Sequence, residues 1–189
     1  TGDVSEAPRL EAMLSHTIQS NKEREMAYVR QATHDALTGC KNRRAFDSDV
    51  AELLNAQQPF AMALVDIDNF KSINDTLGHL TGDIVLRNVA REGIQIMQPH
   101  HVSLYRYGGE EFAVIFQAEQ MTSALSLLEA WRTAVEKRVW REENLRVTFS
   151  GGLGEWHFEP LEQFVGSVDN ALYSAKQQGK NRINRTSIS

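Results

Sequence analysis

Gly108-Gly109-Glu110-Glu111-Phe112 is the stretch of this chain from which its fold can best be read. It separates two short apolar runs, 102–107 and 112–116, a pattern typical of a β-hairpin with two glycines and two acids at its tip. Glycine at such a tip allows the backbone to turn through positive φ and allows a ligand to approach closely. Adjacent carboxylates repel one another, so the pair favours a bound cation.

Two further acids lie upstream. Asp66 and Asp68 follow the run 60–65, the longest apolar stretch of the chain. Its short length and its apolar character on every side indicate a central strand buried on both faces. Acids at the end of a buried strand, facing acids on a hairpin tip, predict a divalent metal site.

The rest of the chain alternates between helical and strand-like patterns. Segment 78–82 is expected to be a loop, with Asp83 capping the helix that follows it. The order β-α-α-β-β-α-β-α-β predicts an α+β fold, with a mainly antiparallel central sheet flanked by helices. Helices are predicted at 42–55, 69–76, 83–97, 121–139 and 160–178, and strands at 60–65, 102–107, 112–116, 146–156 and 181–184.

Residues 1–33 differ from the compact domain expected at 34–189. Charges of both signs are interspersed there, and a stripe of apolar residues is interrupted by Asn21 and Arg24. This pattern predicts a long exposed helical stalk, which could act as a coiled-coil linker. The alternative is a helix that packs against its own domain.

Composition excludes several classes of function. The chain has 189 residues, a net charge of -5 and a pI of about 5.7, which argues against a nucleic-acid polymer or an anionic membrane as partner. Cys40 is the only cysteine, so no internal disulfide can form and a cytoplasmic location is the simplest expectation. No signal peptide or bilayer-spanning run is visible. The first residue is Thr1, so we expect a piece of a longer protein, such as the cytoplasmic part of a sensor.

Five motifs occur in order along the chain. They are 35–44 (DALTGCKNRR), 66–75 (DIDNFKSIND), 78–83 (GHLTGD), 106–112 (RYGGEEF) and 173–181 (YSAKQQGKN). Together they resemble the GGDEF family, the diguanylate cyclases, over about four fifths of the chain. Members of that family join two GTP molecules into cyclic di-GMP and release two pyrophosphates. Their fold is similar to the palm of nucleotide cyclases and polymerases.

The resemblance implies a metal cofactor, Mg²⁺, with Mn²⁺ as a substitute. The implied ligands are the carboxylates of Asp66, Glu110 and Glu111 and the backbone carbonyl of Ile67. Hard oxygen ligands of this kind suit magnesium. Glu110 is also implied to assist removal of the proton from the attacking 3′-hydroxyl.

Several cationic residues are implied to contact the phosphates. Lys71 would stabilise the transferring phosphate, and Lys176 and Lys180 would contact the terminal phosphates. The family commonly has arginine at the second of these positions, so Lys180 lacks the bidentate geometry, and Arg182 could substitute for it.

Guanine recognition is implied for an amide and a carboxylate. Asn74 and Asp83 can match the acceptor and donor edge of guanine, and His79 lies in the same segment. Asp83 could both cap its helix and read the base. The substrate-binding residues implied by the resemblance are Asn69, Phe70, Asn74, His79, Asp83, Lys176 and Lys180.

One family feature is missing. Many members carry an Arg-x-x-Asp product-binding site before the hairpin, but Pro99 and Val102 occupy those positions here. We therefore expect no product inhibition through that site. Because one domain holds one GTP, the resemblance implies catalysis by a two-fold homodimer, which a coiled coil would favour. The alternative function is a catalytically silent module of the same fold that binds GTP or a protein partner.

Overall fold

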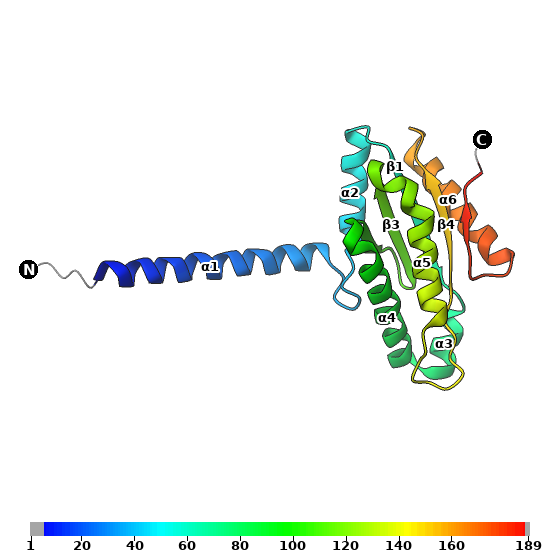
Figure 1. Ribbon diagram of the computed structural model, residues 1–189, viewed down its shortest axis with the longest axis horizontal. Coiled ribbons are helices and arrows are strands. Elements are labelled where there is room, and N and C mark those ends of the chain that lie inside the picture. The colour runs from blue at the N-terminus through cyan, green and yellow to red at the C-terminus, as the bar shows by residue number, and fades with distance from the viewer. Residues whose placement is uncertain (1–5, 188–189) are drawn as a thin grey trace, which may run out of the picture.

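The computed structural model describes residues 6–187, which fold into a helical stalk and an α+β domain (Figure 1). The helices of these residues are α1 (Glu6–Thr33), α2 (Arg43–Asn55), α3 (Phe70–Leu77), α4 (His79–Met97), α5 (Ala124–Lys137) and α6 (Leu161–Gln177), together with the 3-10 helices η1 (Gln98–His100) and η2 (Ala118–Ser123).

A five-stranded sheet forms the centre of the domain. β1 (Phe60–Ile67) lies in the middle and pairs antiparallel with β3 (Glu111–Gln117) and β4 (Phe149–Glu155). β2 (Ser103–Arg106) pairs antiparallel with β3 at one edge, and β5 (Ile183–Arg185) pairs parallel with β4 at the other. The order β2-β3-β1-β4-β5 confirms the predicted, mainly antiparallel sheet.

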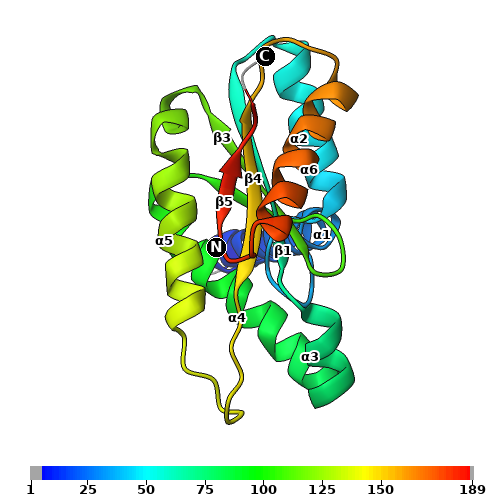
Figure 2. The same cartoon turned by 90° about the vertical axis from the view of Figure 1, so that its right-hand side faces the viewer.

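Helices cover both faces of the sheet, with α4 and α5 on one side and α2 and α6 on the other (Figure 2). Side chains alternate between the two faces of a strand. Ala63 and Val65 of β1 therefore join the core under α4 and α5, whereas Met62 and Leu64 join the core under α2 and α6. This arrangement confirms that the apolar run is a central strand buried on both faces.

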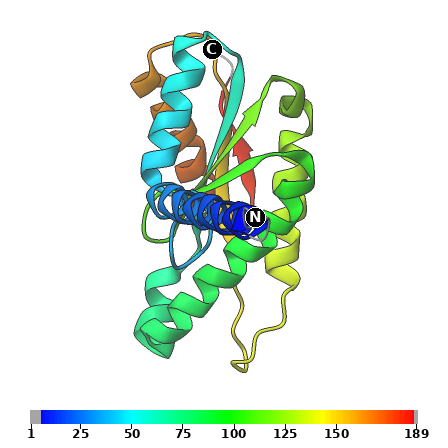
Figure 3. The ribbon, with the colours of Figure 1, turned by 90° about the vertical axis from the view of Figure 1, so that its left-hand side faces the viewer.

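Helix α1 projects away from the domain and is seen almost end-on in Figure 3. None of its residues is buried, which favours a stalk over a helix packed against its own domain. The predicted segments 1–33 and 34–189 include 1–5 and 188–189, which lie outside the described residues. No helix within residues 6–187 has the length and the apolar character needed to cross a membrane.

Two local predictions are wrong. Segment 78–82 is not a loop, because α4 begins at His79, and Asp83 lies inside this helix rather than at its cap. Gly78 occupies the cap position with φ of 90°, and no side chain caps the helix. A glycine in this conformation turns the chain sharply, so α3 and α4 follow one another almost directly.

Candidate active site

Two of the predicted metal ligands lie directly opposite each other in the sheet. Asp66 of β1 is paired with Glu111 of β3. The neighbouring Ile67 donates its N–H to the carbonyl of Glu110 at 3.2 Å, so Asp66 and Glu111 form a non-hydrogen-bonded pair. Side chains approach most closely at such a pair, and like charges placed there repel each other.

A lysine on α6 partly neutralises this pair. Lys176 Nζ lies 2.9 Å from Asp66 Oδ1, because the alternation of β1 turns Asp66 toward the face that α6 covers. Burial raises the pKa of Asp66, and the charges of Glu110 and Asp68 act in the same direction. The ion pair with Lys176 opposes this rise but does not cancel it.

Glu111 shares the same excess of negative charge. Burial raises its pKa, and the charges of Asp66, Asp169 and Glu110 raise it further. One lysine thus faces two carboxylates, Asp66 and Glu111, whose pKa values are both raised. A bound cation would relieve this repulsion.

The donor set fits a divalent cation that takes some of its ligands from the substrate phosphates and from water. Within residues 6–187, no three Asp, Glu, His or Cys side chains form a ready-made metal cluster. Asp66 and Glu111 supply carboxylates, and no hydrogen bond to the carbonyl of Ile67 is found among these residues. Magnesium is usually bound by one or two carboxylates together with waters and substrate phosphates, which such an open set allows.

The hairpin tip is held by an arginine. Arg106 donates to the carbonyl of Gly109 at 3.0 and 3.2 Å and pairs with Asp35 at 3.2 Å. Neither Gly108 nor Gly109 has positive φ, so that part of the expectation is wrong. Gly108 instead lies close to the hairpin acid, since a Cβ there would lie 3.1 Å from Glu111 Oε2.

We expect Asp35→Asn to destabilise the protein by about 1–2 kcal/mol at neutral pH, because Arg106 loses a charged acceptor. Burial alone would raise the pKa of Asp35, but hydrogen bonds from Thr38 and the charge of Arg106 hold that pKa below its usual value. The stabilisation is therefore present above the unfolded-state pKa of about 3.9 and is lost as pH falls through the lowered value. Denaturant unfolding of both proteins between pH 7 and pH 3 measures the difference between their free energies of unfolding. A difference that stayed constant with pH would contradict a stabilising role for the ionised Asp35 carboxylate.

The predicted guanine-reading pair lies between α3 and α4. Asn74 is on α3 and Asp83 is on α4, and Gly82 packs directly against the Asn74 amide. Asn74 Oδ1 is buried and has no hydrogen-bond partner among the described residues. A buried acceptor without a partner is costly unless a ligand satisfies it. His79 is exposed in the first turn of α4.

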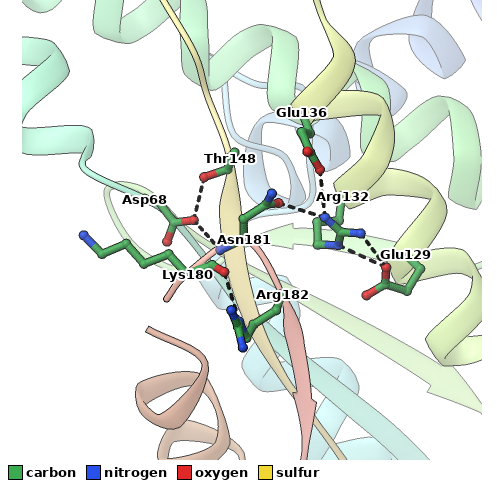
Figure 4. A network of polar contacts seen from close by, with 8 residues as sticks. All are labelled: Asp68, Glu129, Arg132, Glu136, Thr148, Lys180, Asn181 and Arg182. Carbon is green, nitrogen blue, oxygen red and sulfur yellow. Dashed lines mark hydrogen bonds and ion pairs between the residues drawn. The ribbon is translucent and has the colours of Figure 1, made fainter. Parts of the chain in front are cut away.

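The remaining predicted phosphate contacts gather around the start of α3. Lys71 is exposed in its first turn, and Phe70, its first residue, is half-buried. Lys180 Nζ donates to Asn69 Oδ1 at 2.7 Å, although Lys180 is far away in sequence. Arg182 donates to the carbonyl of Lys180, and its side chain leaves the loop in a different direction from that of Lys180 (Figure 4).

Asp68 has a different role from the one its spacing suggests. Both of its oxygens accept hydrogen bonds. Oδ1 accepts from the hydroxyl of Ser150, and Oδ2 accepts from the hydroxyl of Thr148 and the backbone N–H of Asn181. With only 3% of its surface exposed, this carboxylate is fully used within the protein. Two acids separated by one residue look alike in the sequence, so the pattern gave no signal that only Asp66 is available to a metal.

Known proteins match the chain over the same region. Residues 32–182 match the family model described as "Diguanylate cyclase, GGDEF domain". Diguanylate cyclase VdcA of Vibrio cholerae is 37% identical over 168 residues, which cover 86% of this chain and 49% of that protein. Diguanylate cyclase DgcM of Escherichia coli is 35% identical over 186 residues, which cover 96% of this chain and 42% of that protein. The chain therefore spans less than half the length of these relatives.

Solved structures agree with the fold and with the stalk. The coiled coil and GGDEF domain of DgcB from Caulobacter crescentus, in complex with c-di-GMP, matches with a TM-score of 0.79 and 34% identity, over 94% of this chain and 99% of that one. The active GGEEF domain of a diguanylate cyclase from Vibrio cholerae matches with a TM-score of 0.70 and 31% identity, over 79% of this chain and 99% of that one. The family generally uses a divalent metal. Because its family model covers most of the chain and includes both the hairpin and the acids opposite it, the chain belongs to the GGDEF-domain family of diguanylate cyclases.

Proposed function

We propose that the chain is a diguanylate cyclase that condenses two GTP molecules into cyclic di-GMP and releases pyrophosphate. The observation that carries this proposal is the pairing of Asp66 with Glu111 across β1 and β3, beside Lys176. It joins a cation-binding set to a phosphate-binding group within one site. The names of its relatives and the c-di-GMP in the DgcB complex support the same product.

The reaction requires charge stabilisation at an attacking oxygen and at phosphate oxygens. Asp66 and Glu111, together with the Ile67 carbonyl and Glu110, would hold Mg²⁺, and Mn²⁺ could replace it. The ion, when bound, neutralises the triphosphate and lowers the pKa of the attacking hydroxyl. Glu110, at the hairpin tip, accepts the proton of the 3′-hydroxyl.

The lysines supply the remaining positive charge. Lys176 stands beside Asp66, so a phosphate that approaches the acid also meets this ammonium group. The ammonium group of Lys180 lies beside Asn69, which immediately precedes α3. Phe70 is the first residue of this helix, and Lys71, the second, is exposed. Together they bind the terminal phosphates and stabilise the transferring one.

Specificity for guanine comes from side chains of α3 and α4. Asn74 offers a buried oxygen that has no partner among residues 6–187, Asp83 on α4 accepts hydrogen bonds from the base, and His79 lies in the first turn of α4. A site that relies on hydrogen bonds rejects a base that cannot satisfy them.

Incubation with GTP and Mg²⁺, followed by mass spectrometry of the nucleotides, tests this function. We expect cyclic di-GMP and pyrophosphate from the wild-type protein and no product from Glu110→Gln. Manganese should support turnover, and ATP should not be a substrate. GTP binding without any product, from a dimeric preparation, would instead favour the silent-module alternative.

Catalysis requires two domains that face each other, so we propose that the stalk pairs two copies of the chain as a coiled coil. Apolar side chains along α1 are exposed, including Leu14 and Ile18 at 60% and 55%. The coiled coil of DgcB is a related arrangement. Use of GTP supports a cytoplasmic location.

We expect the double substitution Leu14→Glu/Ile18→Glu to lower activity at low protein concentration by about tenfold or more, because an intramolecular encounter becomes a bimolecular one. Raising the protein concentration should restore the rate. Ala12→Glu/His16→Glu, with the same charge and spacing on the other side of the helix, serves as the control. Analytical ultracentrifugation alongside rate measurements checks the result. A monomeric protein with full activity would rule out the stalk's role.

We also expect no inhibition by product bound outside the active site, since Pro99 and Val102 replace the charged positions. Cyclic di-GMP added at low micromolar concentration should leave the maximal rate unchanged, and any effect should appear only as a higher KM for GTP. A lower maximal rate, together with product bound away from the catalytic pocket, would show that another inhibitory site exists.

A further inference from the structure

We propose that Asp68 is a positioning residue that holds the loop after α6 in the one conformation that places Lys180 at the triphosphate. This inference rests on the proposed function for Lys180 and extends it. It assigns to the second acid of the Asp-x-Asp sequence a task that involves no metal contact.

The loop has an unusual backbone. Gly179, Lys180 and Asn181 all have positive φ, of 122°, 66° and 48°. Glycine adopts such angles freely, but the two residues after it do so at a cost. A run of this kind persists only when surrounding contacts determine it.

Asp68 supplies the first of these contacts. The backbone N–H of Asn181 donates to Asp68 Oδ2 at 3.0 Å, and Thr148 Oγ1 donates to the same oxygen at 2.8 Å (Figure 4). Ser150 Oγ donates to the other oxygen at 2.7 Å. The charged acceptor is buried, so its hydrogen bonds are stronger than those between neutral groups.

Arg132 of α5 holds the same loop from the other side. It donates to Asn181 Oδ1 at 2.8 Å and is itself paired with Glu129 at 2.8 Å and Glu136 at 3.0 Å. Asn181 is therefore fixed through its backbone N–H by Asp68, just after β1, and through its side chain by Arg132 of α5. Lys180, between this clamp and Gly179, has little freedom left in its backbone.

The clamp sets the direction of the lysine. Lys180 Nζ reaches Asn69 Oδ1 at 2.7 Å, next to the residue that anchors the loop. A lysine recognises phosphate as a point charge on a flexible stem, without the planar fork of arginine. Its position must therefore come from the backbone that carries it.

The chemistry of the anchor predicts which substitutions it tolerates. In Asp68→Asn, the amide oxygen can still accept from Asn181 and Thr148, while the NH₂ donates to the hydroxyl of Ser150. Asp68→Ala removes all acceptors. Asn181→Gly keeps the backbone N–H and tolerates the positive φ. A β-branched valine at this position strongly disfavours the same backbone angle.

Binding of two nucleotides tests the proposal. The probes are GMP and a GTP analogue with a methylene between its α- and β-phosphates, both with Mg²⁺. We expect Asp68→Ala and Asn181→Val to bind the analogue about tenfold more weakly and GMP unchanged, since only the analogue carries terminal phosphates. Asp68→Asn should stay within about threefold of wild type, because it gives up only part of one hydrogen bond. Asn181→Gly also loses the hydrogen bond from Arg132, so its affinity for the analogue should lie between those of Asp68→Asn and Asn181→Val.

Amide hydrogen exchange without nucleotide provides a second measurement. The Asn181 amide should be protected in wild type and in Asp68→Asn and should exchange faster in Asp68→Ala. If Asp68→Ala does not fold, Asn181→Val still tests the loop conformation, because Asn181 is half-buried and lies in a loop.

The two measurements separate the possible failures. A wild-type protein that does not bind the analogue contradicts the proposed function, while amide exchange still decides the anchoring. If wild type binds and the variants lose GMP and analogue equally, or lose neither, the positioning role of Asp68 is wrong.

Discussion

Asp66→Asn is expected to reduce kcat by about a thousandfold or more, with the fold intact. The substitution removes the charged oxygen that faces Glu111 and Lys176, and with it one of the carboxylate ligands proposed for the divalent cation. An amide is a neutral and much weaker ligand for magnesium than a carboxylate. The lost ion pair with Lys176 should have little effect on stability, because partly exposed pairs contribute only about 0–1 kcal/mol.

Steady-state rates and melting curves of the wild-type protein and three variants test this expectation. Asp75→Asn is the matched control, since Asp75 is an exposed acid on α3. Isothermal titration with Mn²⁺ should show weaker metal binding for Asp66→Asn only. The comparison with Asp68→Asn is equally informative, because it removes an identical charge two residues away and should keep most of the activity. An unchanged rate in Asp66→Asn would make the metal assignment wrong.

Gly82→Ala is expected to raise the KM for GTP by about ten- to a hundredfold, the effect of one or two lost hydrogen bonds to the base. A Cβ at this position would lie 1.8 Å from Asn74 Oδ1 and 2.9 Å from its Cγ. The Asn74 side chain can rotate away, so the protein should still fold. The amide would then no longer face the base.

Gly166→Ala is the matched control for this substitution. Gly166 lies on α6, and an added Cβ there meets nothing within 4 Å. Alanine is a better helix former than glycine, so this variant should be as stable as wild type or slightly more stable. Rates with GTP and ATP measure the effect, and the preference for GTP should fall only in Gly82→Ala. An unchanged KM in a folded Gly82→Ala protein would exclude Asn74 from base recognition.

Much of the fold was predictable because its signals are local. The run 60–65 is apolar on every side and too short for most helices, so it could be placed in the middle of the sheet, as β1 is. The acid-rich tip between two apolar runs marked the hairpin of β2 and β3. Strand ends were less accurate: β1 extends to Ile67, because sheet pairing continues beyond the apolar residues.

Glycine conformation limited the local predictions. An aspartate before a helical run is a good candidate cap, yet Asp83 lies inside α4, because Gly78 turns the chain five residues earlier. At the hairpin, Gly108 leaves space beside the Glu111 carboxylate and does not have positive φ. Residue type alone does not distinguish these two uses of glycine.

By itself, the sequence determined the order of the elements and the set of reactive groups, because both follow from residue type and spacing. Tertiary structure alone decided which groups meet. The alternation of β1 turns Asp66 toward Lys176 on α6, and a left-handed loop returns the Asn181 amide to Asp68, 113 positions away. Such pairs arise from helix packing and sheet register, which no short stretch of sequence encodes.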